Sequence, residues 1–324
     1  MQCLIARARR RLRKQGWPGV EKGPRRSCYN LPGGSAMQVQ FPSTLRVGTS
    51  SWSSTDWCGA FYPETIETGE MISVYARQFN TVEIDSTWYH MPTRAMVDAW
   101  DARTPAGFIF SAKVPRVISH DKYLEGCEAE LKEFVTVMSR LGAKLGPMVL
   151  QFPYVAKGKD PEEYATGRQF LARLRKFVPL LAAEYQWALE IRNPRWVQPE
   201  LLDLLRSREI SLVFIDYYTM DPLPKLAGRS GIFTAPFVYI RFLGNHRAMD
   251  ETVQRARAEG KRRSDWESLL VDRTAQMQLW LPSIRDLASR EVPTYVYFNN
   301  HYAGYAPGSV ELFSKLWHQQ DGPP

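Results

Sequence analysis

Acidic side chains alternate with apolar ones in one short stretch, and they are of the type that acid–base catalysis uses. Glu83 and Asp85 alternate with Val82 and Ile84 in the run TVEID at 81–85. Because successive side chains of a strand face opposite sides, the two carboxylates share one face. A carboxylate on an otherwise apolar strand is costly unless a partner or a wet pocket receives it. We therefore interpret the end of this run as the edge of a functional site.

Polar side chains also end the other apolar runs, and together they form the candidate site. We predict Glu83 and Glu190 as general acid and base, with Lys113 as a third catalytic residue that holds one of them ionised. The candidate ligand-binding residues are polar or aromatic side chains at or after the ends of these runs: Ser50, Trp52, Asp85, Tyr89, Gln151, Arg192, Asp216, Arg241, Asn299 and Asn300. The structural alternative is a set of mutually satisfied ion pairs that plug one end of the fold.

Several reaction classes can be weighed from these residues. Common retaining barrel glycosidases carry carboxylates after strands four and seven, where this chain has Gln151 and Arg241. The histidines show no metal-ligand spacing, and we expect only His90 and His120 to face the site, so we predict no metal and no cofactor. A Schiff base at Lys113 is disfavoured, because neighbouring carboxylates favour the charged ammonium. Hydrolase, lyase and isomerase chemistry stay open.

The cationic and amide residues favour a small anionic partner. Arg241, Asn299 and Asn300 end the seventh and eighth apolar runs, where barrel proteins often bind phosphate. We predict a phosphorylated or sugar-like small-molecule ligand. The alternative is a nucleic-acid-binding or repair-associated protein that accepts one exposed base in the same pocket, with aromatic side chains stacking on it.

Eight repeats of one unit, an apolar run followed by a loop and a helical pattern, position these residues. The runs begin at Arg46, Val82, Phe108, Pro147, Trp187, Ser211, Phe237 and Thr294. In the seventh unit we expect a charged loop and then a helix over about 264–288. Eight such units predict an α/β fold, a single-domain (β/α)8 TIM-like barrel. The alternative of an open doubly wound sheet lacks a Gly-rich dinucleotide turn.

Strand alternation predicts which residues share the barrel opening. We assign apolar residues such as Val47, Leu150, Val213 and Ile215 to the helix-facing side of their strands, and the charged residues to the opposite side. The charged residues then meet at the C-terminal ends of the strands, where barrel enzymes have their active sites. The tryptophans within helical patterns, interpreted as packing residues, are Trp100, Trp266 and Trp280.

The excess positive charge of the chain is concentrated at its N-terminus. The 324 residues carry a formal charge of +8, and residues 1–36 account for all of it with nine Lys and Arg against one Glu. This segment is rich in Gly and Pro, so we expect a disordered basic extension over 1–40 and the barrel domain over 41–324. It could be a nucleic-acid arm, an organelle presequence or translated upstream sequence before a start at Met37, the last of which we favour.

Cysteine spacing and hydropathy bear on the compartment. The four cysteines, at 3, 28, 58 and 127, form no C-x-x-C pair, which is typical of a reducing compartment. No apolar run is long enough to span a bilayer. We expect a cytoplasmic protein without membrane association.

Motifs along most of the chain resemble those of the YecE-like family, catalogued as domain of unknown function 72. They include VGTSSW at 47–52, TVEIDSTWY at 81–89, FSAKVPRVISH at 110–120, LGPMVLQFP at 145–153, LEIRNPRW at 189–196, VYIRFLG at 238–244 and YVYFNN at 295–300. The resemblance extends from about Leu45 to the C-terminus. It implies a TIM-like barrel and no assigned activity.

Overall fold

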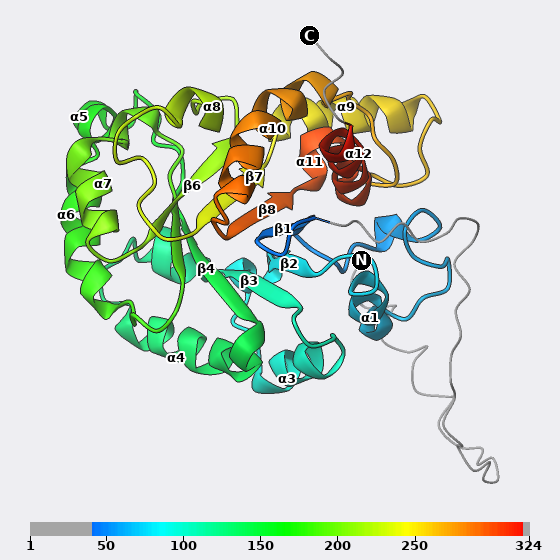
Figure 1. The fold of residues 1–324 in the computed structure, drawn as a ribbon, viewed down its shortest axis with the longest axis horizontal. Helices are drawn as coiled ribbons and strands as arrows, with labels where there is room; N and C mark the ends of the chain where they lie inside the picture. Colours follow the sequence, from blue (N-terminus) through cyan, green and yellow to red (C-terminus); the bar gives the residue numbers. More distant parts are fainter. Residues whose placement is uncertain (1–40, 320–324) are drawn as a thin grey trace, which may run out of the picture. The chain divides into compact units, whose positions relative to one another are not determined.

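Eight parallel strands form the centre of the molecule. The computed structural model describes residues 41–319, so the prediction for the extension over 1–40 lies outside the described residues. The strands are β1 (Leu45–Thr49), β2 (Thr81–Ile84), β3 (Ile109–Lys113), β4 (Leu145–Gln151), β5 (Trp187–Glu190), β6 (Ser211–Asp216), β7 (Val238–Phe242) and β8 (Thr294–Phe298). Their hydrogen-bonded order is β1-β8-β7-β6-β5-β4-β3-β2, which confirms the predicted (β/α)8 barrel (Figure 1).

Helices follow the strands and surround the sheet (Figure 1). They are α1 (Met71–Tyr75), α2 (Ser86–Tyr89), α3 (Arg94–Ala102), α4 (Glu128–Met138), α5 (Pro161–Thr166), α6 (Arg168–Phe177), α7 (Pro199–Arg206), α8 (Leu223–Leu226), α9 (His246–Ala258), α10 (Thr274–Ser289), α11 (Asn300–Ala303) and α12 (Ala306–His318). Within the described part of the chain, no helix is long and apolar enough to cross a membrane.

The seventh unit differs from the prediction. Helix α9 occupies the segment expected to be a charged loop, and the helix expected from residue 264 begins only at Thr274. The side-chain oxygen of Asn245 accepts the backbone N–H of Ala248 at 3.2 Å and caps α9. Met249, Val253 and Ala256 form a narrow buried stripe in an otherwise charged helix. Such a stripe is too sparse to stand out as hydrophobic periodicity.

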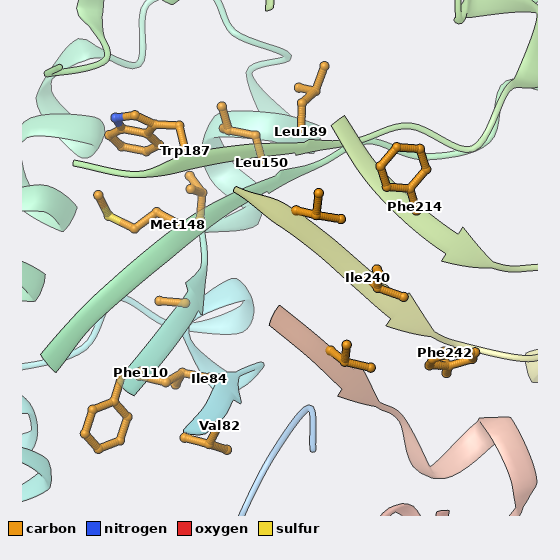
Figure 2. Packing of buried hydrophobic residues seen from close by; sticks show 14 of the residues in the cluster. Val82, Ile84, Phe110, Met148, Leu150, Trp187, Leu189, Phe214, Ile240 and Phe242 are labelled. Carbon is orange, nitrogen blue, oxygen red and sulfur yellow. The ribbon is translucent and has the colours of Figure 1, made fainter. Parts of the chain in front are cut away.

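Alternate residues of the strands pack outward against the helices. Figure 2 shows members of this outer cluster, among them Val82, Phe110, Leu150 and Ile240. Their placement confirms the predicted parity for these strands.

The assignment for β6 was wrong. Val213 and Ile215 belong to the cluster inside the barrel, while Phe214 packs outward. The run SLVFI at 211–215 is almost continuously apolar, as expected for a strand buried on both faces, and therefore has no period to read.

The barrel is nearly closed between β1 and β2, the two ends of the hydrogen-bonded order. The Tyr75 hydroxyl lies in this seam, where it accepts the backbone N–H of Thr49 at 3.0 Å and donates to the carbonyl of Thr81 at 3.1 Å. A Cβ atom on Gly48 would lie 2.3 Å from the Thr81 carbonyl oxygen, so this approach requires glycine. The Tyr75 hydroxyl thus replaces some of the hydrogen bonds that a paired β1 and β2 would make.

Replacing Tyr75 by Phe should therefore weaken the seam. The substitution leaves the Thr49 N–H and the Thr81 carbonyl without this partner, so we expect the free energy of unfolding in urea to fall by about 1–3 kcal/mol. Tyr218→Phe is the matched control, because Tyr218 is 64% exposed and should change stability by less than about 0.5 kcal/mol. Equal effects of the two substitutions would contradict the bridging role.

Candidate functional site

A cavity of about 350 Å³ opens at the C-terminal ends of the strands. It is lined by Ser50, Ser51, Trp57, Asp85, Trp88, Tyr89, Lys113, Gln151, Arg192, Arg241, Leu243, His246, Trp266, Phe298, Asn299, Asn300, His301 and Ala306. A volume of this size is at the lower end of the range for small-molecule sites.

Most of the predicted site residues meet in this cavity. The lining includes the candidate residues Ser50, Asp85, Tyr89, Lys113, Gln151, Arg192, Arg241, Asn299 and Asn300. They come from seven different strands or the segments that follow them, which is the arrangement that strand parity predicted.

The two glutamates proposed as acid and base lie beneath the cavity, bound to Arg241. Arg241 donates one N–H to Glu83 at 2.7 Å and another to Glu190. The Tyr239 hydroxyl donates to the second carboxylate oxygen of Glu83 at 2.7 Å. The Nε–H of Arg192 donates to the second carboxylate oxygen of Glu190 at 2.9 Å. Both glutamates are fully buried and absent from the lining. This geometry favours a role in holding Arg241 over direct contact with a ligand.

The electrostatics of Glu190 agree with that role. Burial by itself raises the pKa of Glu190, but the neighbouring Arg241, Arg192 and Lys113 outweigh it and lower the pKa to about 2. Glu190 is therefore ionised at neutral pH and acts as a fixed counter-charge.

Lys113 forms a second charged group at the cavity wall. Its ammonium lies 2.9 Å from a carboxylate oxygen of Asp85 and 4.9 Å from the ring centroid of Trp88. The side chain of Asp85 is 27% exposed, so Asp85 is the more accessible partner of the pair. This pair provides the carboxylate neighbour that we expected for Lys113.

Two predicted ligand-binding residues lie elsewhere. Trp52 packs edge-on against Trp100 in the outer cluster, with the ring centroids 5.4 Å apart. It does so because β1 ends at Thr49 and strand alternation no longer applies after it. Asp216 lies beside Arg273 and Tyr302, where burial raises its pKa. It lies on the outward face of β6, because Val213 and Ile215 face the inside of the barrel and the side chains of a strand alternate.

The histidines that reach the cavity are not those expected. His90 and His120 are absent from the lining, whereas His246 and His301 line it and stack in parallel with centroids 4.2 Å apart. Both follow strand ends, in the segments LGNH and FNNH, so position in the chain was an available signal. Burial is the largest effect on His246 and, together with His301 and nearby arginines, lowers its pKa to about 3. Its imidazole is therefore neutral at pH 7.

Tryptophans add apolar walls to the cavity. Trp57, Trp88 and Trp266 line it, although Trp266 was interpreted as a packing residue. The ring of Trp266 lies 4.6 Å from that of His301, in the segment before α10 that is not helical. The helical interpretation of this segment caused the error.

Four cavity-lining side chains each have a buried polar atom without a hydrogen-bond partner in residues 41–319. They are Ser50 Oγ, Trp88 Nε1, Arg241 Nε and His246 Nε2. An unpaired buried polar atom costs about 1–3 kcal/mol, so their concentration in one cavity is unfavourable for the protein alone. A ligand with acceptor oxygens could pair with them. No group of three His, Cys, Asp or Glu side chains in this range is arranged to hold a metal ion.

Comparison with known proteins places this architecture in one family. Residues 46–323 match the family model described as "Protein of unknown function DUF72". The chain is 30% identical over 185 residues to the UPF0759 protein YecE of Escherichia coli strain K12, an alignment that spans 57% of this chain and only 62% of that relative.

Solved structures agree in fold. A DUF72 family protein from Thermotoga maritima is 26% identical, with a TM-score of 0.66 over 85% of this chain and 99% of the other. Another from Enterococcus faecalis is 21% identical, with a TM-score of 0.63 over 86% of this chain and 98% of the other.

Proposed function

This chain belongs to the family of unknown function DUF72, and from the geometry of its cavity we propose that it binds a small polar, anionic ligand and performs acid–base chemistry on it. The ligand class that we propose is a phosphorylated or sugar-like molecule. The observation that carries the proposal is the set of four unpaired polar atoms at Ser50, Trp88, Arg241 and His246.

The charges of the lining support an anionic group on the ligand. Lys113, Arg192 and Arg241 line the cavity, whereas Asp85 is its one carboxylate among the described residues. The counter-charges Glu83 and Glu190 lie behind Arg241. An anionic oxygen in the cavity would therefore meet cationic groups before it met the buried carboxylates, and charge-assisted hydrogen bonds are the stronger kind.

The same arrangement bears on the reaction. Hydrolysis of a glycoside by paired carboxylates needs two such groups beside the substrate, and only Asp85 among residues 41–319 lines the cavity. We propose Lys113 as the group that exchanges a proton with the ligand and the neutral His246 as a hydrogen-bonding residue, with Glu83 and Glu190 as positioning residues for Arg241. Lyase or isomerase chemistry fits this set better than glycoside hydrolysis.

We also propose a reducing, cytoplasmic setting. Cys58 and Cys127 are both free thiols in the structure, in keeping with the cysteine spacing.

Ser50→Ala tests the ligand proposal with little structural cost. Ser50 Oγ has no partner to lose among the described residues, so the variant should be at least as stable as the wild type. Binding of a hexose phosphate, measured by titration calorimetry, should weaken about fivefold because one hydrogen bond of about 1 kcal/mol is removed. Inorganic phosphate serves as a second probe that lacks the sugar.

Lys113→Met should have a larger effect on the same probes, because it removes a charge-assisted hydrogen bond of about 1.5–3 kcal/mol. Lys225→Met is the matched control, since the Lys225 side chain is 68% exposed and pairs with Asp221 outside the cavity. Binding of these probes that is equally strong in the wild type and in both cavity variants would refute the assignment of this cavity to an anionic ligand.

A further inference from the structure

The exposed tyrosine side chains of the described residues all lie in the segments that follow strand ends. Among residues 41–319, they are Tyr89, Tyr154 and Tyr218, which are 57%, 38% and 64% exposed. They follow β2, β4 and β6 respectively. An exposed tyrosine gains nothing from burial, so its repetition on one end of the barrel calls for a partner that covers it.

Each exposed tyrosine belongs to a pair of rings that carries an arginine. Tyr89 contacts Trp88 at a centroid distance of 4.8 Å, and the guanidinium of Arg116 lies 5.1 Å from the Trp88 ring. Tyr218 contacts Tyr217 at 4.4 Å, and the guanidinium of Arg192 lies 4.8 Å from Tyr217.

The third set has the same composition. Tyr154 and Tyr164 have ring centroids 6.2 Å apart, and the guanidinium of Arg195 lies 5.3 Å from the Tyr164 ring. Tyr154 lies near Tyr218 and Arg195, so the second and third sets are neighbours on the surface. Trp88, Tyr89 and Arg192 also line the cavity, which connects the sets to its mouth.

We infer that these three ring–arginine sets form a platform for single-stranded nucleic acid. Stacking of bases on aromatic rings beside cationic groups that meet the backbone phosphates is how proteins bind single strands. A guanidinium forms charge-assisted hydrogen bonds with a phosphate and weaker ones with a neutral sugar hydroxyl, so the repeated arginine favours a polyanion with flat bases over a neutral oligosaccharide. Duplex binding is disfavoured because paired bases do not expose their faces to the rings.

Fluorescence anisotropy with the full-length protein and a labelled oligothymidylate of about 12 nucleotides tests this platform. The titrations should be made at about 0.3 M salt, which weakens the contribution of the basic residues 1–36. Tyr154→Ala and Tyr218→Ala should each weaken binding about tenfold, and the double variant about a hundredfold, as expected for stacked bases. Leu279→Ala, at a residue that is 51% exposed on α10, is the control and should bind like the wild type.

An abasic oligonucleotide of equal length separates stacking from charge. The wild type should bind it at least as weakly as the double variant binds oligothymidylate, because the double variant keeps the Trp88 and Tyr89 rings. The inference is overturned if the double variant binds oligothymidylate like the wild type, if the abasic strand binds as tightly as oligothymidylate, or if a neutral oligosaccharide binds and oligothymidylate does not. Tyr154 and Tyr218 do not line the cavity, so this inference and the proposed small-ligand function can fail separately.

Discussion

Replacing Arg241 by Met should lower the free energy of unfolding by about 3–5 kcal/mol, because it leaves two buried carboxylates without their shared counter-charge. Glu83 and Glu190 are fully buried, and Arg241 donates to both. The side chain of Met is of similar length, so the lost packing contributes less than the uncompensated charge. Urea unfolding monitored by circular dichroism would measure the loss.

Arg247→Met provides the matched comparison. The Arg247 side chain is 91% exposed and pairs only with Glu251 one helical turn away in the described contacts, so its loss should cost about 0.5 kcal/mol or less. Addition of Glu83→Gln to Arg241→Met should recover part of the stability, since it removes the buried carboxylate that Arg241 neutralises, whereas Glu190 keeps its ion pair with Arg192. A cost for Arg241→Met no greater than that for Arg247→Met would contradict the buried ion-pair cluster.

Acid should destabilise the protein through Glu190 over a defined pH range. The folded-state pKa of Glu190 is about 2, below its ordinary value of 4.5. A group with a depressed folded pKa contributes stability that is fully present above the unfolded value and is lost as the pH falls through the folded value. We therefore expect a loss of roughly 3 kcal/mol between about pH 5 and pH 2 from this carboxyl.

Glu190→Gln isolates this contribution from those of other carboxyl groups. The variant should be less stable than the wild type at pH 7, and the difference between the two should shrink toward pH 2, where the wild-type carboxyl is protonated. The neutral His246, with its pKa lowered to about 3, destabilises the fold from about pH 6.5 downward in both proteins. Glu190 is a minor influence that raises this pKa, so the contribution of His246 differs between the two proteins only below about pH 3. A difference that is constant across this range would contradict the assigned ionisation of Glu190.

Arg241, at the floor of the cavity, thus has a structural role and a proposed role in ligand binding. Arg241 is fixed by carboxylates behind it, yet its Nε atom has no partner among residues 41–319 and belongs to the cavity lining. A cation fixed in this way needs no rearrangement to receive an anion, which is the physical meaning of a preorganised site. Burial of the Arg241 guanidinium removes it from water at a cost in free energy, and the two carboxylates offset that cost.

The barrel and half of the cavity lining were predictable from local pattern. Alternation places Lys113, Gln151 and Arg241 on the inner face whatever the rest of the chain does, because side chains of a strand alternate by geometry. Parallel strands then bring their C-terminal ends to one opening. Local sequence also begins helix α3, where the Thr93 side chain accepts the backbone N–H of Met96 at 3.2 Å.

Tertiary structure decided what alternation does not determine. Trp52 turned outward once β1 ended, and Asp216 fell on the outer face of a strand with no readable period. Trp266 and His301 became neighbours only because loops after β7 and β8 meet. Depth within the barrel was equally hidden: Glu83 and Glu190 face inward as predicted, but the long side chain of Arg241 reaches over them and takes their place in the cavity lining. Local pattern specifies the face of a strand, whereas side-chain length and the path of loops between strands set depth and proximity, and these depend on the whole fold.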